Sequence, residues 1–174
     1  VERRTGERVP QGRLERRDDA AVYEEVFSAG DTTGIFQFGS DGMQEVLQEM
    51  GPSEFGHIVA MNALYRPGPM ELLPDYIDRV HGEEEVVYLA ESVHDEVKGD
   101  VGDVLEDTYG IMVFQEQVMQ VCRRLAGFTL EEADLMRRAI SKKKEALLMG
   151  QRKKFVQGGV DEGYDRSLGE TIFE

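Results

Sequence analysis

The feature that most constrains the fold is a helical spacing of apolar residues that glycine and proline repeatedly interrupt. In the segment 115–126, four apolar residues recur at intervals of three and four, so they share one face of a helix. These residues are Val118, Val121, Cys122 and Leu125. Gly127 follows directly and suits the left-handed residue that ends many helices. Helices this short must be buried against one another, because in isolation they are marginal in water.

Start and stop signals divide the rest of the chain in the same way. Thr129 and Glu132 have the spacing of a capping box, which predicts that a new helix starts there. A last helix is expected over 145–157, with Gly158-Gly159 as its end. At 66–69 the sequence Arg-Pro-Gly-Pro forbids helix, because two prolines remove backbone donors and fix φ.

Strand signals are few. Apolar residues at 35–38, 86–89 and 110–114 predict short strands. The acidic stretch 82–107 is otherwise predicted to be mostly loop, since it carries glycines and few periodic apolar residues. The predicted fold class is therefore mainly α with a few short strands.

Charge is distributed unevenly along the chain. The net charge is −15, but residues 122–154 carry ten Lys and Arg against four acids, a local net charge of +6. We call the helical region that contains them, residues 116–157, the basic island. Nucleic acid responds to local charge, and Arg and Lys on a helix face suit phosphate groups. The alternative is a solvated helix face whose bases pair with Glu131, Glu132 and Asp134, and both interpretations stay open.

Composition excludes several classes of protein. No apolar run approaches the roughly 20 residues that a membrane helix needs, and the first residues are too charged for a signal peptide. The lone cysteine, Cys122, fits a reducing compartment and is interpreted as a buried structural residue. The three histidines lack the spacing of a zinc site. We expect a cytoplasmic protein with no membrane association.

Two groups of polar residues admit a functional and a structural interpretation. Asp100 and Asp103, with Glu106 and Asp107, carry the residue type that binds paired Mg²⁺ ions, but their polar, Gly-rich surroundings favour a solvated acidic loop. Gln115 and Gln117 open a helix after an apolar segment. Their amides either reach into a groove or cap and pack the helix.

Four motifs, taken in order, resemble one protein family. Their sequence and spacing are similar to the alpha subunit of bacterial DNA polymerase III, the family C replicative DNA polymerases, over about residues 20–174. The motifs are 34–38 (GIFQF), 63–69 (ALYRPGP), 108–119 (TYGIMVFQEQVM) and 134–144 (DLMRRAISKKK).

The resemblance implies that the chain is a fragment covering the end of the palm and the fingers. It assigns residues 1–32 to a linker or peripheral segment joining the palm, and residues 33–174 to a helical fingers-type subdomain. The family's three metal-binding aspartates would lie upstream of residue 1. Mg²⁺ is therefore expected in the full-length enzyme, with neither a metal ligand nor a catalytic residue in this chain. The full-length protein is expected to be a DNA-directed DNA polymerase, and the fragment alone is expected to be inactive.

The resemblance also implies contacts to an incoming deoxynucleoside triphosphate and to primer–template DNA. Other replicase subunits, such as the sliding clamp and the proofreading subunit, are expected to bind regions outside this chain. The alternative function is a stand-alone acidic protein-interaction module whose basic helix docks an acidic partner. Under the polymerase interpretation, the nucleotide- or DNA-binding residues are Arg66, Arg137, Arg138, Lys142, Lys143 and Lys144, and the supporting residues are Gln37, Tyr109 and Gln115.

Overall fold

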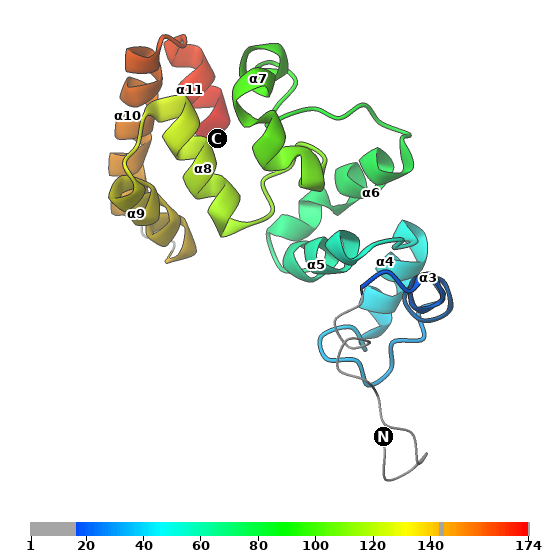
Figure 1. Ribbon diagram of the computed structural model, residues 1–174. Helices are drawn as coiled ribbons and strands as arrows, with labels where there is room; N and C mark the ends of the chain where they lie inside the picture. Colours follow the sequence, from blue (N-terminus) through cyan, green and yellow to red (C-terminus); the bar gives the residue numbers. More distant parts are fainter. Residues whose placement is uncertain (1–16, 143–144, 174) are drawn as a thin grey trace. The chain divides into compact units, whose positions relative to one another are not determined.

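Helices are the regular secondary structure in the part of the chain that a computed structural model describes, residues 17–142 and 145–173. Turns and irregular backbone connect them. The predicted mainly helical class is confirmed (Figure 1). The elements in chain order are α3 (Ala20–Val22), η1 (Tyr23–Ser28), α4 (Asp41–Met50), α5 (Phe55–Leu64), η2 (Pro69–Leu72), α6 (Leu73–His81), α7 (His94–Leu105), η3 (Glu106–Thr108), α8 (Gln115–Ala126), α9 (Leu130–Ser141), α10 (Glu145–Glu162) and α11 (Arg166–Phe173).

The chain divides into two compact units, Val1–Pro67 and Gly68–Glu174. The division falls inside the bend predicted at 66–69, where Gly68 adopts a φ of 103° that side chains rarely tolerate. The separate assignment of residues 1–32 to a linker and 33–174 to fingers stays a prediction, and residues 1–16 lie outside the described ranges.

The first unit is organised around α4. The Ser40 side chain accepts a hydrogen bond from the backbone amide of Met43, which caps the start of the helix. Gly51 ends it in the left-handed conformation. The helix buries its apolar face and contacts η1, where Phe27 packs edge-on against Phe38 with ring centroids 5.7 Å apart. The buried residues of α4 are Met43, Leu47 and Met50.

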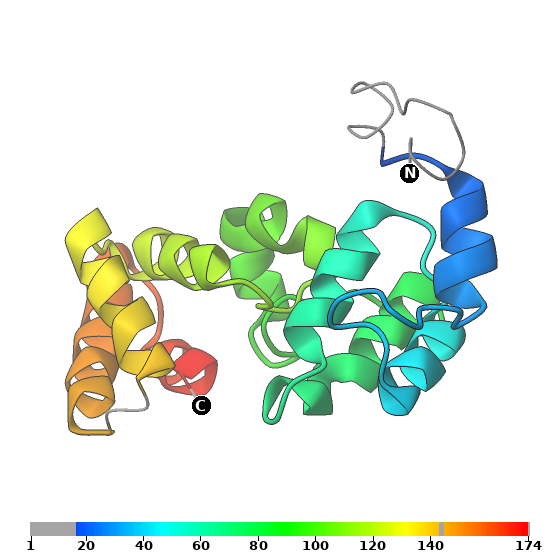
Figure 2. The same cartoon turned by 90° about the horizontal axis from the view of Figure 1, so that it is seen from below.

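The second unit holds one continuous hydrophobic core that α7 to α11 share. Helix α8 contacts α7, α9 and α10, and α10 also contacts α9 and α11. In both views α8, α9 and α11 lie beside α10 (Figures 1 and 2). The basic island therefore belongs to a helical bundle. Its charged residues lie on the helix faces that do not pack into the hydrophobic core.

The prediction of a loop over 82–107 is wrong for its second half, which forms α7. Val93, Val97, Val101 and Leu105 recur every four residues and are at most 4 % exposed. This stripe is only one residue wide per turn, and acids and glycines fill the rest of the helix. The narrow stripe was hidden by a composition typical of loops.

The expected end of the last helix at Gly158-Gly159 is also wrong, because α10 continues to Glu162. A Cβ atom at Gly158 would lie 2.3 Å from the backbone oxygen of Ala126 in α8. The glycine therefore permits a close approach of two helices and does not stop one.

The short strands predicted at 35–38, 86–89 and 110–114 are turns and irregular backbone, and the described ranges contain no strand. Gln37 and Leu89 adopt φ values of 69° and 66°, which break extended backbone. The amides of Val113 and Phe114 both donate to the side chain of Gln117, so a neighbouring strand cannot use them. A single backbone bond, from Leu89 to Gly110, joins the second and third segments.

Candidate nucleic-acid interface

Helix α9 carries the central charges of the basic island, and its local sequence determines which way they face. The predicted capping box is present: Thr129 Oγ1 accepts from the Glu132 amide, and Glu132 Oε2 accepts from the Thr129 amide. The helix buries Ala133, Met136 and Ala139. Arg137 and Arg138 lie off this buried stripe, with 31 % and 51 % of their side chains exposed.

Asp134 brings the two arginines together. Arg137 donates from Nε and Nη2 to Asp134 Oδ1 at 2.9 and 2.7 Å. Arg138 Nε lies 3.0 Å from Asp134 Oδ2. The hydrogen bond from Arg137, helped by the charges of both arginines, lowers the pKa of Asp134. The carboxylate therefore stays ionised between two cations at neutral pH.

Gln115 extends this group from α9 to the start of α8. Its Oε1 accepts from Arg137 Nη1 at 3.0 Å, and its Nε2 donates to Ser141 Oγ at 3.2 Å. Ser141 in turn donates to the backbone oxygen of Arg137 at 2.9 Å. We call the set of Gln115, Asp134, Arg137, Arg138 and Ser141 the arginine cluster. The structure thus unites three of the predicted site residues, Gln115, Arg137 and Arg138.

The remaining predicted residues have different surroundings. Lys142 is exposed at the C-cap of α9, while Lys143 and Lys144 lie outside the described residues. Arg66 and Gln37 belong to the first unit, where Arg66 Nε donates to the Asn62 carbonyl at 3.2 Å. Gln37 is exposed in a turn.

Tyr109 is positioned by backbone geometry within the second unit. It takes the left-handed conformation at φ 52°, and its ring packs edge-on against Tyr76 at 5.5 Å. The Tyr109 carbonyl accepts from Arg79 Nη1 at 3.1 Å, and the same nitrogen donates to the Val87 carbonyl at 2.9 Å. These contacts fix the path of the chain before α8.

Sequence reasoning did not count Asp134 and Ser141 among the site residues. The signal for Asp134 was available, because acids three and four positions before an arginine face it on a helix. It supported only the alternative of a self-paired helix face. Ser141 had no comparable signal, since its contact with Gln115 joins residues 26 positions apart.

Other bases of the island are paired with acids. Arg124 forms an ion pair with Asp103 on α7, and Lys154 Nζ lies 2.6 Å from Glu132 Oε1. The hydrogen bond from Lys154, helped by the hydrogen bonds with Thr129, lowers the pKa of Glu132 to about 2. The alternative of a self-paired face is thus correct about Glu132, which pairs with Lys154, and about Asp134, which pairs with both arginines. Arg124 differs, because its partner Asp103 belongs to α7.

Two of the four carboxylates considered for metal binding have other partners. Asp103 receives the guanidinium of Arg124, and Asp100 Oδ2 accepts the Tyr164 hydroxyl at 2.6 Å. Within 17–142 and 145–173, no group of three or more acid, histidine or cysteine side chains is arranged to hold a metal ion.

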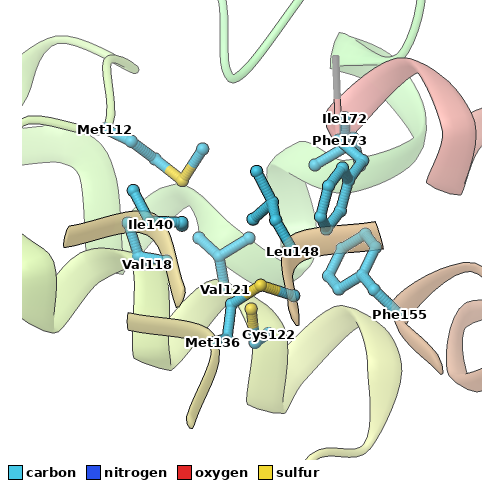
Figure 3. A pocket seen from close by; sticks show the side chains of 10 residues that line it. All are labelled: Met112, Val118, Val121, Cys122, Met136, Ile140, Leu148, Phe155, Ile172 and Phe173. Atoms are coloured by element: carbon cyan, nitrogen blue, oxygen red, sulfur yellow. The ribbon is translucent and has the colours of Figure 1, made fainter. Parts of the chain in front are cut away.

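An apolar pocket of about 330 Å³, partly open to the surface, lies between helices of the bundle that carries the arginines (Figure 3). Burial raises the pKa of the Cys122 thiol in its wall to about 12, so the sulfur stays protonated and is not a nucleophile. The absence of charged groups from its lining makes it unsuited to a nucleotide. The lining residues are Met112, Val118, Val121, Cys122, Met136, Ile140, Leu148, Phe155, Ile172 and Phe173.

No described helix combines the length and the apolar character needed to span a bilayer.

Comparisons with known proteins agree on one family. The family model of the bacterial DNA polymerase III alpha subunit finger domain matches residues 1–163. The chain is 48 % identical over 157 residues to DNA polymerase III subunit alpha of Halalkalibacterium halodurans, covering 90 % of this chain and 13 % of that protein. It is 48 % identical over 149 residues to the same subunit of Bacillus subtilis, covering 86 % of this chain and 13 % of the relative.

The subunit of Staphylococcus epidermidis is 43 % identical over 157 residues, which are 90 % of this chain and 14 % of that protein. The chain thus spans about one seventh of the length of these relatives. The family match covers nearly the whole chain, and it includes both α8 and α9. The chain belongs to the family of bacterial DNA polymerase III alpha subunit finger domains.

Proposed function

We propose that this chain is the fingers region of a DNA-directed DNA polymerase, and that it contacts the incoming deoxynucleoside triphosphate and the primer–template DNA. The observation that carries the proposal is the arginine cluster, which lies within the residues that the family model matches. Arginine suits phosphate because its planar N–H groups match two oxygens at once. The comparisons give no support to the alternative of a stand-alone acidic interaction module.

The cluster contributes binding and electrostatic stabilisation. During nucleotide addition, negative charge moves onto the leaving pyrophosphate, and cations placed beside it stabilise the transition state. Among the described residues, no three or more acid, histidine or cysteine side chains come together as a site for Mg²⁺. We therefore assign no step to a metal here, and propose that Mg²⁺ is held by other parts of the full-length polymerase.

The wider assignments follow from the same proposal. The full-length protein works in the cytoplasm with other replicase subunits, which bind outside this chain. Arg66, Lys142, Lys143 and Lys144 are proposed to add phosphate contacts, and Gln37 and Tyr109 to support the nascent base pair.

The test is made in the full-length polymerase with Arg138→Ala. Arg138 is half exposed, and Asp134 occupies only its Nε edge, so truncation removes phosphate contacts without opening the core. Losing a charge-assisted contact costs about 1.5–3 kcal/mol, so kcat/KM for nucleotide addition should fall about ten- to a hundredfold. The dissociation constant for primer–template should change much less.

Lys153→Ala is the matched control, because it removes the same charge from an exposed position on α10. It should cost far less activity than Arg138→Ala. Equal losses for the two variants would show that the island acts only through diffuse electrostatics, and the proposed contact would be wrong.

A further inference from the structure

The carboxylate of Asp134 occupies one edge of each arginine in the cluster. An arginine side chain has five N–H groups, one on Nε and two on each Nη. Asp134 Oδ1 takes the Nε and Nη2 donors of Arg137, and Oδ2 lies against Nε of Arg138. Each side chain is therefore held by the edge that includes Nε.

The outer ends of both guanidinium groups stay available. Gln115 uses one Nη1 proton of Arg137, which leaves one proton on Nη1 and one on Nη2. The Nη groups of Arg138 have no partner among the described residues, and half of this side chain is exposed. The cluster thus fixes two arginines in place while keeping donors free for an anion.

The surroundings of Asp134 and Arg137 order this ion pair more than an exposed surface ion pair would be ordered. Only 33 % of the Asp134 side chain is exposed, and the side chain of Arg137 is similarly covered. Gln115 braces Arg137 from another helix, and Ser141 braces Gln115. The contacts restrict the rotamers of a long side chain before a ligand arrives, so less freedom is lost on binding.

We propose that Asp134 is a positioning residue that holds Arg137 and Arg138 ready for the triphosphate of the incoming nucleotide. This inference rests on the proposed function, because it assumes that the cluster binds phosphate. It goes further because it assigns Asp134 a favourable role in phosphate binding, although the negative charge of an acid repels phosphate.

The two possible roles of Asp134 predict changes of opposite sign. If its charge only neutralises the arginines, removing it leaves more positive potential and strengthens triphosphate binding. If it positions the arginines, removing it releases both side chains and weakens binding. The direction of the change therefore separates the two roles.

The experiment measures single-nucleotide addition by the full-length polymerase carrying Asp134→Ala or Asp134→Glu. Asp134→Ala should raise KM for the deoxynucleoside triphosphate about tenfold, the effect of one lost charge-assisted contact. Primer–template affinity should stay within about twofold, because Asp134→Ala keeps both arginine charges and duplex affinity depends mainly on charge. Asp134→Glu restores a carboxylate that reaches residues three and four positions on, and should recover most of the lost affinity.

Glu131→Gln is the matched control, since it removes one negative charge from an exposed position on the same helix. Its KM should stay within about twofold of the parent's. A KM for Asp134→Ala that is unchanged or lower would overturn the positioning role, as would equal changes in Asp134→Ala and Glu131→Gln. Failure of Asp134→Glu to recover affinity would also count against it.

Arg138→Ala, measured beside these variants, separates this inference from the proposed function. A raised KM in Arg138→Ala with an unchanged KM in Asp134→Ala overturns only the positioning role. Unchanged kinetics in Arg138→Ala would overturn the proposed function, and the role of Asp134 with it.

Discussion

Gln115 and Gln117 stand two positions apart at the start of α8, yet their side chains join opposite kinds of network. Gln117 is 6 % exposed and satisfies four neutral groups: it accepts from the amides of Val113 and Phe114, and donates to Val104 and Thr108. Gln115 is exposed and joins the charged arginine cluster.

The difference shows how one short motif can serve both the fold and the site. A buried polar side chain must be fully bonded, so Gln117 fixes the chain before α8 in a single path. An exposed amide can exchange its partners with water or a ligand at low cost. Within three positions, the chain therefore holds a structural residue, Gln117, and a residue for which we propose a function, Gln115.

The largest expected effect is on stability, from Gln117→Leu. The substitution leaves two amides, one carbonyl and one hydroxyl without this partner, at buried or partly buried positions. We expect the free energy of unfolding to fall by about 3 kcal/mol, since each unsatisfied buried group costs about 1–3 kcal/mol. Denaturant unfolding of the chain measures it. Gln115→Leu is the matched control and should change stability by less than about 0.5 kcal/mol.

The next effect is on activity, from Gln115→Ala in the full-length polymerase. Arg137 loses its brace on α8 but keeps Asp134, so the loss should be partial. Losing a single hydrogen bond to a charged group should decrease kcat/KM about tenfold. Steady-state kinetics with a primer–template measures it. Unchanged kinetics, or destabilisation as large as in Gln117→Leu, would break the contrast between the two residues.

Sequence reasoning predicted the elements whose signals are local. The capping box at Thr129 and the helix end at Gly127 each depend on a few neighbouring residues, and the structure confirms them. The bend predicted at 66–69 is present at 66–68, whereas Pro69 begins η2. Helix α7 was missed because its valines occupy only every fourth position among acids and glycines. The continuation of α10 was missed because the role of Gly158 depends on Ala126, 32 positions earlier in the chain.

The candidate site shows the same division. Arg137, Arg138 and Gln115 could be chosen from residue type and motif, but their mutual contacts join α8 to α9 across 22 residues. The sequence left open whether Asp134 merely neutralises the arginines. The answer depends on which edge of each guanidinium group the carboxylate contacts. The spacing of residues in a sequence does not predict side-chain geometry of this kind.

The smallest expected effect is on stability, from Lys154→Met. It contrasts the ion pair of Lys154 and Glu132 with the neutral hydrogen bonds of Gln117. The hydrogen bond from Lys154, helped by the hydrogen bonds with Thr129 in the capping box, lowers the pKa of Glu132 from 4.5 to about 2. Because the pKa is lower in the folded state, this contact stabilises the fold above pH 4.5 and is lost as the pH falls towards 2. Lys154→Met should therefore be less stable than the parent near neutral pH, and the difference should close in acid.

Thermal unfolding of the two proteins between pH 7 and pH 2 measures this difference. Destabilisation by Gln117→Leu should persist across the same range, since its partners do not titrate. A constant difference between Lys154→Met and the parent at every pH would contradict the ionic origin of the contact.

The most direct test of the central claim, that the arginine cluster binds phosphate, is the salt dependence of DNA binding by this chain. We expect weak binding to primed DNA, because the net charge of −15 opposes it. The logarithm of the affinity should fall with the logarithm of salt by roughly 0.9 for each phosphate contact. Arg137→Glu with Arg138→Glu should abolish binding. Lys98→Glu with Lys153→Glu, the same change in net charge at exposed positions on α7 and α10, should weaken it only slightly. Binding by the arginine double variant as tight as that of the parent, or equal losses in both pairs, would contradict the account.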